Sequence, residues 1–222
     1  ISAYLINLLG PSQFVNILHD FGLNNPDIDK NTSPVLCLGP CEASVGEMAS
    51  AYTTFANGGI RCAPLFVTKI EDSHGNVIAK FQPLMTEVIS EVSSYQMIDM
   101  LRAVIQGGTG SRLRYAYHLT ADMGGKTGTT NNNADGWFMG ITPNLVSGCW
   151  VGGEDRDIHF DHTSMGQGAT MALPVWAYYM QRVYADKRLG YSQSTKFTMP
   201  AKFNPCQTAD TINVNGIQEE YF

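Results

Sequence analysis

Gly124-Gly125-Lys126-Thr127-Gly128-Thr129-Thr130 is the stretch that decides the interpretation of this sequence, because it sets one cation and three hydroxyl groups among three glycines. Glycine leaves the backbone uncovered, so a ligand can lie close against it. A lysine neutralises a carboxylate, and threonine hydroxyls donate hydrogen bonds to it. The candidate ligand-binding residues are therefore Lys126, Thr127, Gly128, Thr129 and Thr130.

A phosphate-binding loop is one alternative for this stretch, since such loops follow the pattern Gly-x-x-x-x-Gly-Lys-[Ser/Thr]. Counting back from Gly125, the pattern needs a glycine at position 120, where this chain has Thr120. The loop should also open a helix, whereas Asn131-Asn132-Asn133 predicts a turn into another strand. The sequence therefore argues against a nucleotide site.

A β-strand is the other alternative. Side chains alternate along a strand, so positions 126, 128 and 130 are expected on one face and 127 and 129 on the other. An extended peptide would then pair with the strand edge, where Gly128 leaves room for it. An ordinary edge strand with a solvated lysine explains these residues equally well, so the flanking sequence must decide.

Composition and charge limit the class of protein. The chain has 222 residues, 44% of them hydrophobic and 15% charged, which is typical of a folded domain. The net charge of −6 and the absence of a basic run argue against a nucleic-acid partner. No apolar stretch approaches the roughly 18 residues of a membrane span. Because Ile1-Ser2 is not a start or a signal region, we expect a fragment whose anchor lies upstream.

Helices are predicted from apolar spacing and stop signals. Ser44 and Glu47 fit a capping box at the start of one of them. Residues 24–41, rich in Asn, Asp and Pro, are expected to form a loop, and the chain from about 190 an irregular, loosely packed tail. The predicted helices cover residues 2–9, 11–21, about 44–56 and 91–106, with a last one from near Pro174.

Strands are predicted where β-branched and aromatic residues gather between turn signals. Ser73-His74-Gly75-Asn76 is expected to turn a hairpin, and Pro143-Asn144 to connect the last two strands. Trp150 and Trp176 are expected in the core. The predicted strands cover residues 65–72, 77–82, 124–130, 136–142 and 145–152.

Cysteines and metal-ligand residue types give weaker signals. Cys37 and Cys41 flank a tight turn and suit either a small disulfide loop or two free thiols, the interpretation we favour. No second Cys or His pair has zinc-finger spacing. For the polar run at 155–162 we favour a solvated loop, so we predict no metal and no cofactor. That run contains Asp155, Asp157, His159, Asp161 and His162.

The flanking sequence resembles one family. Met48-Ala49-Ser50-Ala51-Tyr52-Thr53-Thr54-Phe55-Ala56-Asn57-Gly58-Gly59 is similar to the helix and turn between the second and third motifs of class A, bifunctional penicillin-binding proteins. Lys-Thr-Gly at 126–128 is similar to that family's third motif. The resemblance covers roughly residues 1–185. Further matches, in order, are Asp135-Gly136-Trp137-Phe138-Met139-Gly140, Thr142-Pro143, Trp150-Val151-Gly152 and Pro174-Val175-Trp176.

The resemblance implies an α+β fold of the penicillin-binding transpeptidase (serine β-lactamase-like) type, here an incomplete antiparallel sheet packed with helices. Residues 1–189 would form the C-terminal portion of the transpeptidase domain, and 190–222 an irregular tail. Within the first unit we expect a helical part at 1–60, a β-hairpin at 61–90, and the long helix, site strands and C-terminal helix at 91–189. An incomplete sheet exposes an edge and apolar surface, so we also expect self-association.

The resemblance also implies an activity. In that family a serine in Ser-x-x-Lys attacks the D-Ala-D-Ala end of a peptidoglycan stem peptide, and an amine of a neighbouring stem resolves the acyl-enzyme to make a cross-link. β-Lactams mimic the donor. The implied partners are stem peptides and β-lactams, and the implied location is the extracytoplasmic face of the cytoplasmic membrane, with an anchor and a glycosyltransferase domain upstream.

Residue roles follow only where positions match. Lys126 would supply charge for the terminal carboxylate and help tune proton transfers, and the hydroxyls of Thr127 and Thr129 would bind that carboxylate. The backbone N–H of Thr129 would be one oxyanion donor. Gly128 and Thr130 would line the cleft.

Two motifs of the family are missing from this sequence. No lysine has a serine three positions before it, and no Ser-x-Asn occurs. We therefore expect half a site and an inactive chain. The alternatives are a non-catalytic module of the same fold that recognises cell-wall peptides or β-lactams, and a β-lactamase or carboxypeptidase relative.

Overall fold

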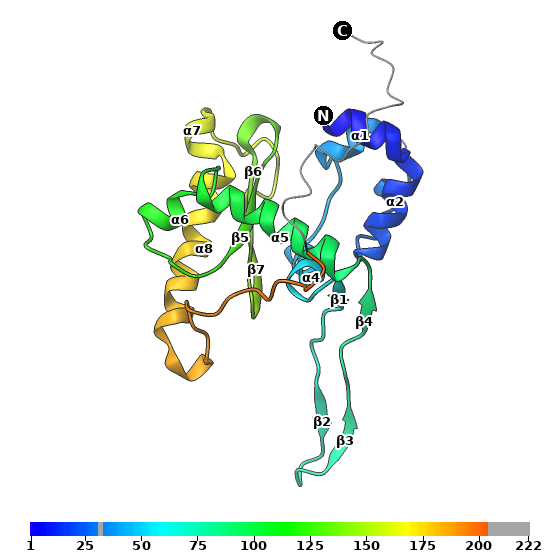
Figure 1. Cartoon of the computed structure of the whole chain (residues 1–222), viewed down its shortest axis with the longest axis vertical. Coiled ribbons are helices and arrows are strands. Elements are labelled where there is room, and N and C mark those ends of the chain that lie inside the picture. The colour runs from blue at the N-terminus through cyan, green and yellow to red at the C-terminus, as the bar shows by residue number, and fades with distance from the viewer. Residues whose placement is uncertain (31–32, 204–222) are drawn as a thin grey trace.

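Three antiparallel strands form the centre of the computed structural model, which describes residues 1–30 and 33–203 (Figure 1). They are β5 (Gly124–Thr129), β6 (Asp135–Thr142) and β7 (Leu145–Gly152), in the order β5-β6-β7. Thr142 pairs with Leu145 across the predicted turn. The three strands predicted for this part of the chain are confirmed within one residue at each end.

Helices cover both faces of this sheet. On one face, α8 (Gly168–Ala185) packs so closely that a Cβ on Gly140 would lie 2.3 Å from the Trp176 ring. Trp176 also meets Phe138 edge to face at 5.0 Å between ring centroids. On the other face lie α4 (Val45–Ala56) and α5 (Glu91–Gln106). The sheet and its two helical layers form the principal core.

The helix predicted near Pro174 begins six residues earlier, at Gly168, so that boundary was wrong. Proline suits the first turn of a helix, which is why the sequence suggested a start there. Tertiary packing decides otherwise, since Gly168 lies directly on the backbone of β5 and β6. A Cβ at this position would lie 2.3 Å from the carbonyl oxygen of Gly128. The helix therefore starts where only glycine fits.

The N-terminal part is more helical than expected. Helices α1 (Ser2–Leu9) and α2 (Pro11–Asp20) are confirmed, but the loop predicted at 24–41 contains α3 (Pro26–Lys30) and the 3₁₀ helix η1 (Pro34–Leu38). In each short helix a proline occupies the first position. Their buried residues, Ile28 and Leu36, join a small cluster with Ile6 and Val15. Burial of these side chains, which the loop prediction ignored, stabilises both turns.

The start of α4 and the whole of α5 follow the sequence prediction. The Ser44 Oγ accepts from the Glu47 N–H at 3.2 Å, and the Glu47 carboxylate accepts from the Ser44 N–H at 2.8 Å, which completes the capping box. The bounds of α5 agree with the prediction of 91–106. Here local signals and packing favour the same boundaries.

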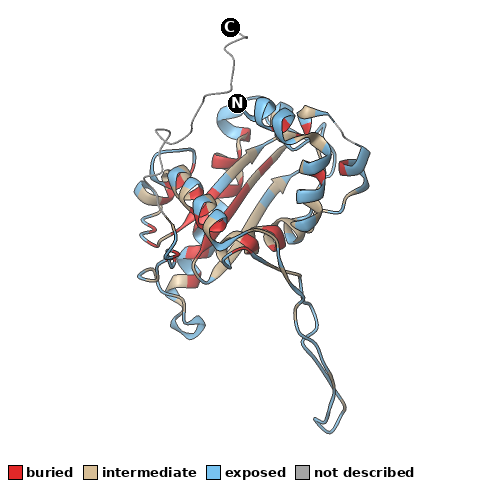
Figure 2. Cartoon of the chain, turned by 45° about the vertical axis from the view of Figure 1, so that its right-hand side comes forward, coloured by how far each residue is buried: buried red, intermediate tan, exposed pale blue. Residues whose placement is uncertain are grey.

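Residues 60–87 form an exposed ribbon that projects from the body of the molecule (Figures 1 and 2). Its strands are shorter than predicted, with β2 (Lys69–Glu71) paired to β3 (Val77–Lys80). The sequence did not predict the second pair, β1 (Ile60–Cys62) with β4 (Met85–Glu87). Three-residue strands are too short for a periodicity signal.

The C-terminal strap, residues 190–203, is packed and not loose, which corrects the prediction for this part of the tail. Phe197 is buried, and its N–H donates to the Asp122 carboxylate at 3.0 Å. Phe203 meets Tyr95 edge to face at 4.7 Å. Polar composition suggested a loose tail, but a few apolar and hydrogen-bonding residues of the strap pack against α5 and the residues before β5. Residues 204–222 lie outside the described residues.

The described cysteines form no disulfide. Cys37, Cys41, Cys62 and Cys149 are free thiols, as favoured for the first two, and Cys206 lies outside the described residues. The 155–162 run lies in an exposed loop. No helix within 1–30 or 33–203 is long and apolar enough to cross a membrane. The short elements are α6 (Arg112–Tyr115), η2 (Asn131–Asn133), α7 (Thr163–Gly166) and η3 (Lys187–Leu189).

The predicted α+β class is confirmed by this arrangement of helices around small antiparallel sheets. Trp176 is buried as expected, whereas Trp150 is 41% exposed because β7 is an edge strand. The division of the chain at residue 189 stays a prediction.

The exposed edge of β7 predicts self-association, because unpaired edges and apolar surface favour pairing between chains. Light scattering should give a mass above 24.3 kDa that rises with protein concentration. Trp150→Lys should lower the apparent mass, since a charge on an edge strand opposes pairing. A single monomer mass at all concentrations would contradict the prediction.

Candidate functional site

The candidate site lies on β5, which is hydrogen-bonded to β6 along one edge and has no strand partner on the other among the described residues. The Thr130 N–H donates to the Asp135 carbonyl at 3.1 Å. Backbone groups alternate in direction along a strand, so Gly128 and Lys126 also face β6. The N–H and C=O groups of Thr127 and Thr129 therefore face the open edge, where an extended peptide can pair with them.

Lys126 projects from the sheet into solvent. Its Nζ donates to the carbonyl oxygen of the next residue, Thr127, at 2.7 Å. This contact agrees with the direction deduced for the Thr127 backbone, and it sets a positive charge beside the open edge. The ammonium group remains accessible to a carboxylate, because it is exposed and its three donors are not all used.

The Thr127 hydroxyl lies 2.7 Å from the hydroxyl of Thr109. Thr109 belongs to the turn Gly107-Gly108-Thr109-Gly110 between α5 and α6. The turn is packed tightly, since a Cβ on Gly108 would lie 2.9 Å from Val104 Cα and one on Gly110 2.7 Å from Ile105 Cδ1. Its glycines thus hold Thr109 against β5. A hydroxyl of the α5–α6 turn therefore lies next to a hydroxyl of the site strand.

The Thr129 hydroxyl accepts a hydrogen bond from the N–H of Gly168 at 3.0 Å. Gly168 is the first residue of α8, so Thr129 satisfies one of the unpaired N–H groups at that helix end. The hydroxyl proton of Thr129 is left for another acceptor. This contact ties the C-terminal end of the site strand to α8.

Thr130 closes the turn from β5 to β6. Its Oγ1 accepts from the Asp135 N–H at 2.9 Å and lies 3.4 Å from the Asp135 carboxylate. The other carboxylate oxygen of Asp135 accepts from the Trp150 indole N–H at 2.9 Å. Asp135 therefore joins all three strands at the end of the sheet where the open edge of β5 finishes.

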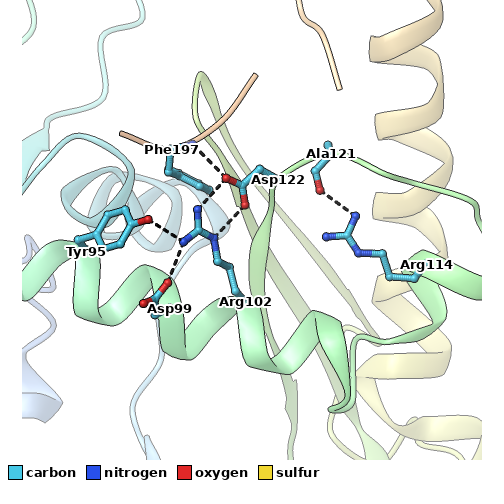
Figure 3. Close-up of polar contacts among 7 residues, drawn as sticks. All are labelled: Tyr95, Asp99, Arg102, Arg114, Ala121, Asp122 and Phe197. Atoms are coloured by element: carbon cyan, nitrogen blue, oxygen red, sulfur yellow. Dashed lines mark hydrogen bonds and ion pairs between the residues drawn. The ribbon is translucent and has the colours of Figure 1, made fainter. Parts of the chain in front are cut away.

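The segment before β5, residues 119–123 (the entry segment), is irregular and largely buried. Figure 3 shows the side chains that surround it. The Arg102 guanidinium binds both carboxylate oxygens of Asp122, at 2.8 and 2.6 Å, and also reaches Asp99 at 2.7 Å. Arg102 additionally lies over the rings of Tyr95 and Phe197, at 5.3 and 5.2 Å. This cluster links α5, the entry segment and the C-terminal strap.

The surroundings of Asp122 stabilise the ionised form of its carboxyl group. Burial by itself raises the pKa of this carboxyl, but hydrogen bonds from Arg102 and from the Phe197 N–H, together with the positive charges nearby, lower it overall. Asp122 is therefore ionised at neutral pH and forms a charge-assisted pair with Arg102.

The arrangement on β5 suits an extended ligand with a carboxylate and does not suit a phosphate loop. β5 continues into η2 and β6 and not into a helix N-terminus, so the strand–loop–helix geometry of a nucleotide site is absent there. Two hollows of the described part lie elsewhere, one at the exposed ribbon and one between α4, α5 and the strap. The open edge of β5 is one side of a binding site and does not form a closed pocket by itself.

The structure thus brings the sequence-predicted residues together on one strand and adds partners that the sequence did not indicate. Thr109, Asp135 and Gly168 each contact a hydroxyl of the stretch. They lie 18 positions before and 5 and 39 positions after their partners, so no local pattern linked them.

Comparison with known proteins gives a consistent result. Residues 4–147 match the family described as the penicillin binding protein transpeptidase domain. Penicillin-binding protein 1A of Aquifex aeolicus is 38% identical over 148 residues, which is 67% of this chain and 20% of the relative. Penicillin-binding protein 1A of Neisseria lactamica is 34% identical over 191 residues, 82% of this chain and 22% of the relative. The chain spans about a fifth of the length of these curated relatives.

Solved structures share the fold. Penicillin-binding protein 1A from Haemophilus influenzae superposes with a TM-score of 0.76 at 26% identity, over 91% of this chain and 34% of that chain. The penicillin-binding protein PonA1 from Mycobacterium tuberculosis gives a TM-score of 0.68 at 24% identity, over 84% of this chain and 51% of that chain.

Asp122→Asn is expected to lower the free energy of unfolding by about 3 kcal/mol at pH 7, because it removes the buried, bidentate partner of Arg102. The half-buried guanidinium then keeps only the more exposed carboxylate of Asp99. The folded pKa of Asp122 is lowered, so its contribution is present above the unfolded value near 4 and is lost as pH falls through the folded pKa. Urea unfolding at pH 7 and pH 3 should therefore show a difference between wild type and variant that shrinks at pH 3.

Asp186→Asn is the matched control for that measurement. Asp186 also binds an arginine through both oxygens, but its partner Arg188 is 90% exposed. Exposed pairs contribute little, so no measurable loss is expected. Equal losses for the two variants would contradict the role given to the Arg102–Asp122 pair.

Proposed function

The chain belongs to the transpeptidase-domain family of class A penicillin-binding proteins, and on that premise we propose that β5 is the substrate-binding wall of a D,D-transpeptidase site. The predicted fold, an α+β transpeptidase fold with an incomplete antiparallel sheet, is confirmed by the structural relatives. The activity, substrates and location of the whole protein are part of the proposal.

The observation that supports the proposal most directly is the open edge of β5. Thr127 and Thr129 direct backbone donors and acceptors toward it, and Lys126 stands beside it. A stem peptide ending in D-Ala-D-Ala is extended and anionic at its C-terminus, so it can pair with the edge and bring its carboxylate to the lysine and the hydroxyls. No other described strand combines these three features.

The proposed chemistry is acyl transfer through a serine supplied by another part of the whole protein. The serine oxygen attacks the carbonyl carbon of the penultimate D-Ala, the amide C–N bond breaks, and the terminal D-Ala leaves as a protonated amine. The amine of a neighbouring stem peptide then attacks the ester and releases the serine. Stem peptides are the partners in this scheme, and β-lactams acylate the same serine.

Thr129 serves this chemistry through its backbone. Its N–H faces the open edge, where it can donate to the oxyanion that forms on the attacked carbonyl. Removing one such donor typically costs about 100 to 1,000-fold in rate. The contact of the Thr129 hydroxyl with Gly168 fixes the residue in place, so this donor is preorganised.

The carboxylate is assigned to Lys126 and to the hydroxyl pair of Thr127 and Thr109. The hydroxyl of Thr129 is assigned to the carboxylate as well, because its contact with Gly168 leaves its proton free. Each hydroxyl has one proton, and only one of the two can donate across their 2.7 Å contact. The other proton is then free for the carboxylate. Gly128 and Thr130 complete the wall, and we assign no cofactor or metal to it.

We place the whole protein at the extracytoplasmic face of the bacterial cytoplasmic membrane, with an anchor and a glycosyltransferase domain outside this chain. The 222 residues alone contain neither Ser-x-x-Lys nor Ser-x-Asn. The chain by itself therefore supplies one wall of the site and no nucleophile, and it is inactive in this proposal.

A fluorescent penicillin should test both halves of the proposal. The purified 222-residue chain is expected to remain unlabelled, because it lacks the nucleophile. The whole protein should be labelled, and excess unlabelled penicillin added beforehand should prevent this labelling. Covalent labelling of the chain alone would overturn its predicted inactivity. A whole protein that is never labelled would overturn the assignment of the site.

Thr127→Val and Thr109→Val, made separately in the whole protein, should each slow acylation by penicillin about ten-fold or more. A hydrogen bond to a charged group contributes roughly 1.5–3 kcal/mol, and each 1.4 kcal/mol corresponds to a factor of ten. The matched Thr→Ser variants keep the hydroxyl and should react nearly as fast as wild type. Normal rates in the Val variants would remove these hydroxyls from the site.

A further inference from the structure

The entry segment has an unusual hydrogen-bonding requirement. Leu119, Ala121 and Met123 are at most 2% exposed, yet the backbone here is neither helix nor strand. Buried backbone N–H and C=O groups need partners, and an irregular segment cannot supply them from its own neighbours. The Leu119 N–H donates to the backbone carbonyl of Leu113 at 3.0 Å, and side chains from outside the segment bind several of the other groups.

Arg114 supplies the donors. Its Nη1 donates to the carbonyl oxygens of Leu119 and Ala121, both at 2.8 Å, and the second contact is drawn in Figure 3. Arg114 belongs to α6, which follows α5 directly. The carbonyl side of the entry segment is thus held from the helical layer.

Gln193 of the C-terminal strap supplies the acceptor. Its Oε1 accepts from the N–H of Thr120 at 2.7 Å, from the N–H of Ala121 at 3.2 Å and from the Thr120 hydroxyl at 3.1 Å. One side chain, 73 and 72 residues farther along the chain, therefore satisfies two consecutive backbone donors of the entry segment.

Phe197 makes the second attachment of the strap. Its N–H donates to Asp122, and its ring covers the Arg102 guanidinium that binds the same carboxylate. Phe197 also belongs to a buried cluster with Leu101, the residue whose Cβ would lie 2.7 Å from a Cβ on Gly124. The strap thus contacts both the entry segment and the side of α5 on which β5 begins.

We propose that the C-terminal strap is a positioning element for the site strand, acting through Gln193 and Phe197. Asp122 precedes Lys126 by four residues, so the place and direction of β5 are set where the strap holds the entry segment. That β5 binds substrate rests on the proposed function, but the mechanical role of the strap does not.

Hydrogen exchange in the 222-residue chain tests the mechanical role without any ligand. In Gln193→Ala, two N–H groups lose their acceptor, and the amides of Lys126 and Gly128, which pair with β6, should exchange about ten-fold faster. That factor corresponds to a loss of ~1.4 kcal/mol in the free energy of local opening, within the range for lost hydrogen bonds. The amide of Ala177, buried in α8, should keep its wild-type rate.

Three further variants sharpen the test. Gln193→Glu keeps an acceptor oxygen and should restore slow exchange. Gln181→Ala removes a glutamine that bonds the nearby carbonyl of Tyr117 at 2.9 Å but not the entry segment, so exchange in β5 should not change. Phe197→Leu keeps an apolar side chain at this position, removes the ring from Arg102 and should also raise the exchange rate in β5. It replaces Gln193→Ala as the test variant if Gln193→Ala does not fold.

Exchange at Lys126 and Gly128 that stays at the wild-type rate in Gln193→Ala, or that rises equally at Ala177, would overturn the proposal, because the strap would then have no local effect. In the whole protein, Gln193→Ala should slow acylation by penicillin, and Gln193→Glu should restore it. A wild-type protein that is never acylated contradicts the proposed function instead, so the two failures are distinguishable.

Discussion

Gly168, the first residue of α8, lies on the backbone of β5 and β6 and donates its N–H to the hydroxyl of Thr129. Any side chain there would collide with the carbonyl oxygen of Gly128. This contact sets α8 across one face of the sheet and fixes the end of the site strand. On the opposite face of the sheet, the close approach of Gly124 to α5 positions that helix in the same way. Between the two helical layers, β5 keeps one edge for β6 and leaves the other open.

The two ends of β5 are held by different means. At the C-terminal end, the hydroxyls of Thr129 and Thr130 bond to α8 and to the start of β6. At the N-terminal end, side chains of α5, α6 and the strap bind the entry segment, with Arg102 at the centre. A strand held at both ends can present a rigid open edge, which is what recognition of an extended peptide needs.

The long, strongly patterned elements could be predicted from the sequence. The capping box at Ser44, the bounds of α5 and the three sheet strands follow from local signals that packing reinforces. The predictions failed where a distant contact decides the structure. Pro174 suggested a helix start that Gly168 overrides, and the strap appeared loose because Phe197 and Gln193 give no periodic signal. Three-residue strands and one-turn helices are likewise too short to leave a pattern.

Local patterns were enough to predict a glycine-rich strand at residues 124–130 with a lysine and three hydroxyls, and the flanking residues indicated its family. Side-chain alternation and turn chemistry are local, so they can be followed along one stretch of chain. The open edge of that strand and the remote residues that hold it could be identified only from the folded chain. Thr109, Gly168 and Gln193 reach the strand or its entry segment from positions far apart in the chain, and contacts of that kind arise from packing, which no local pattern encodes.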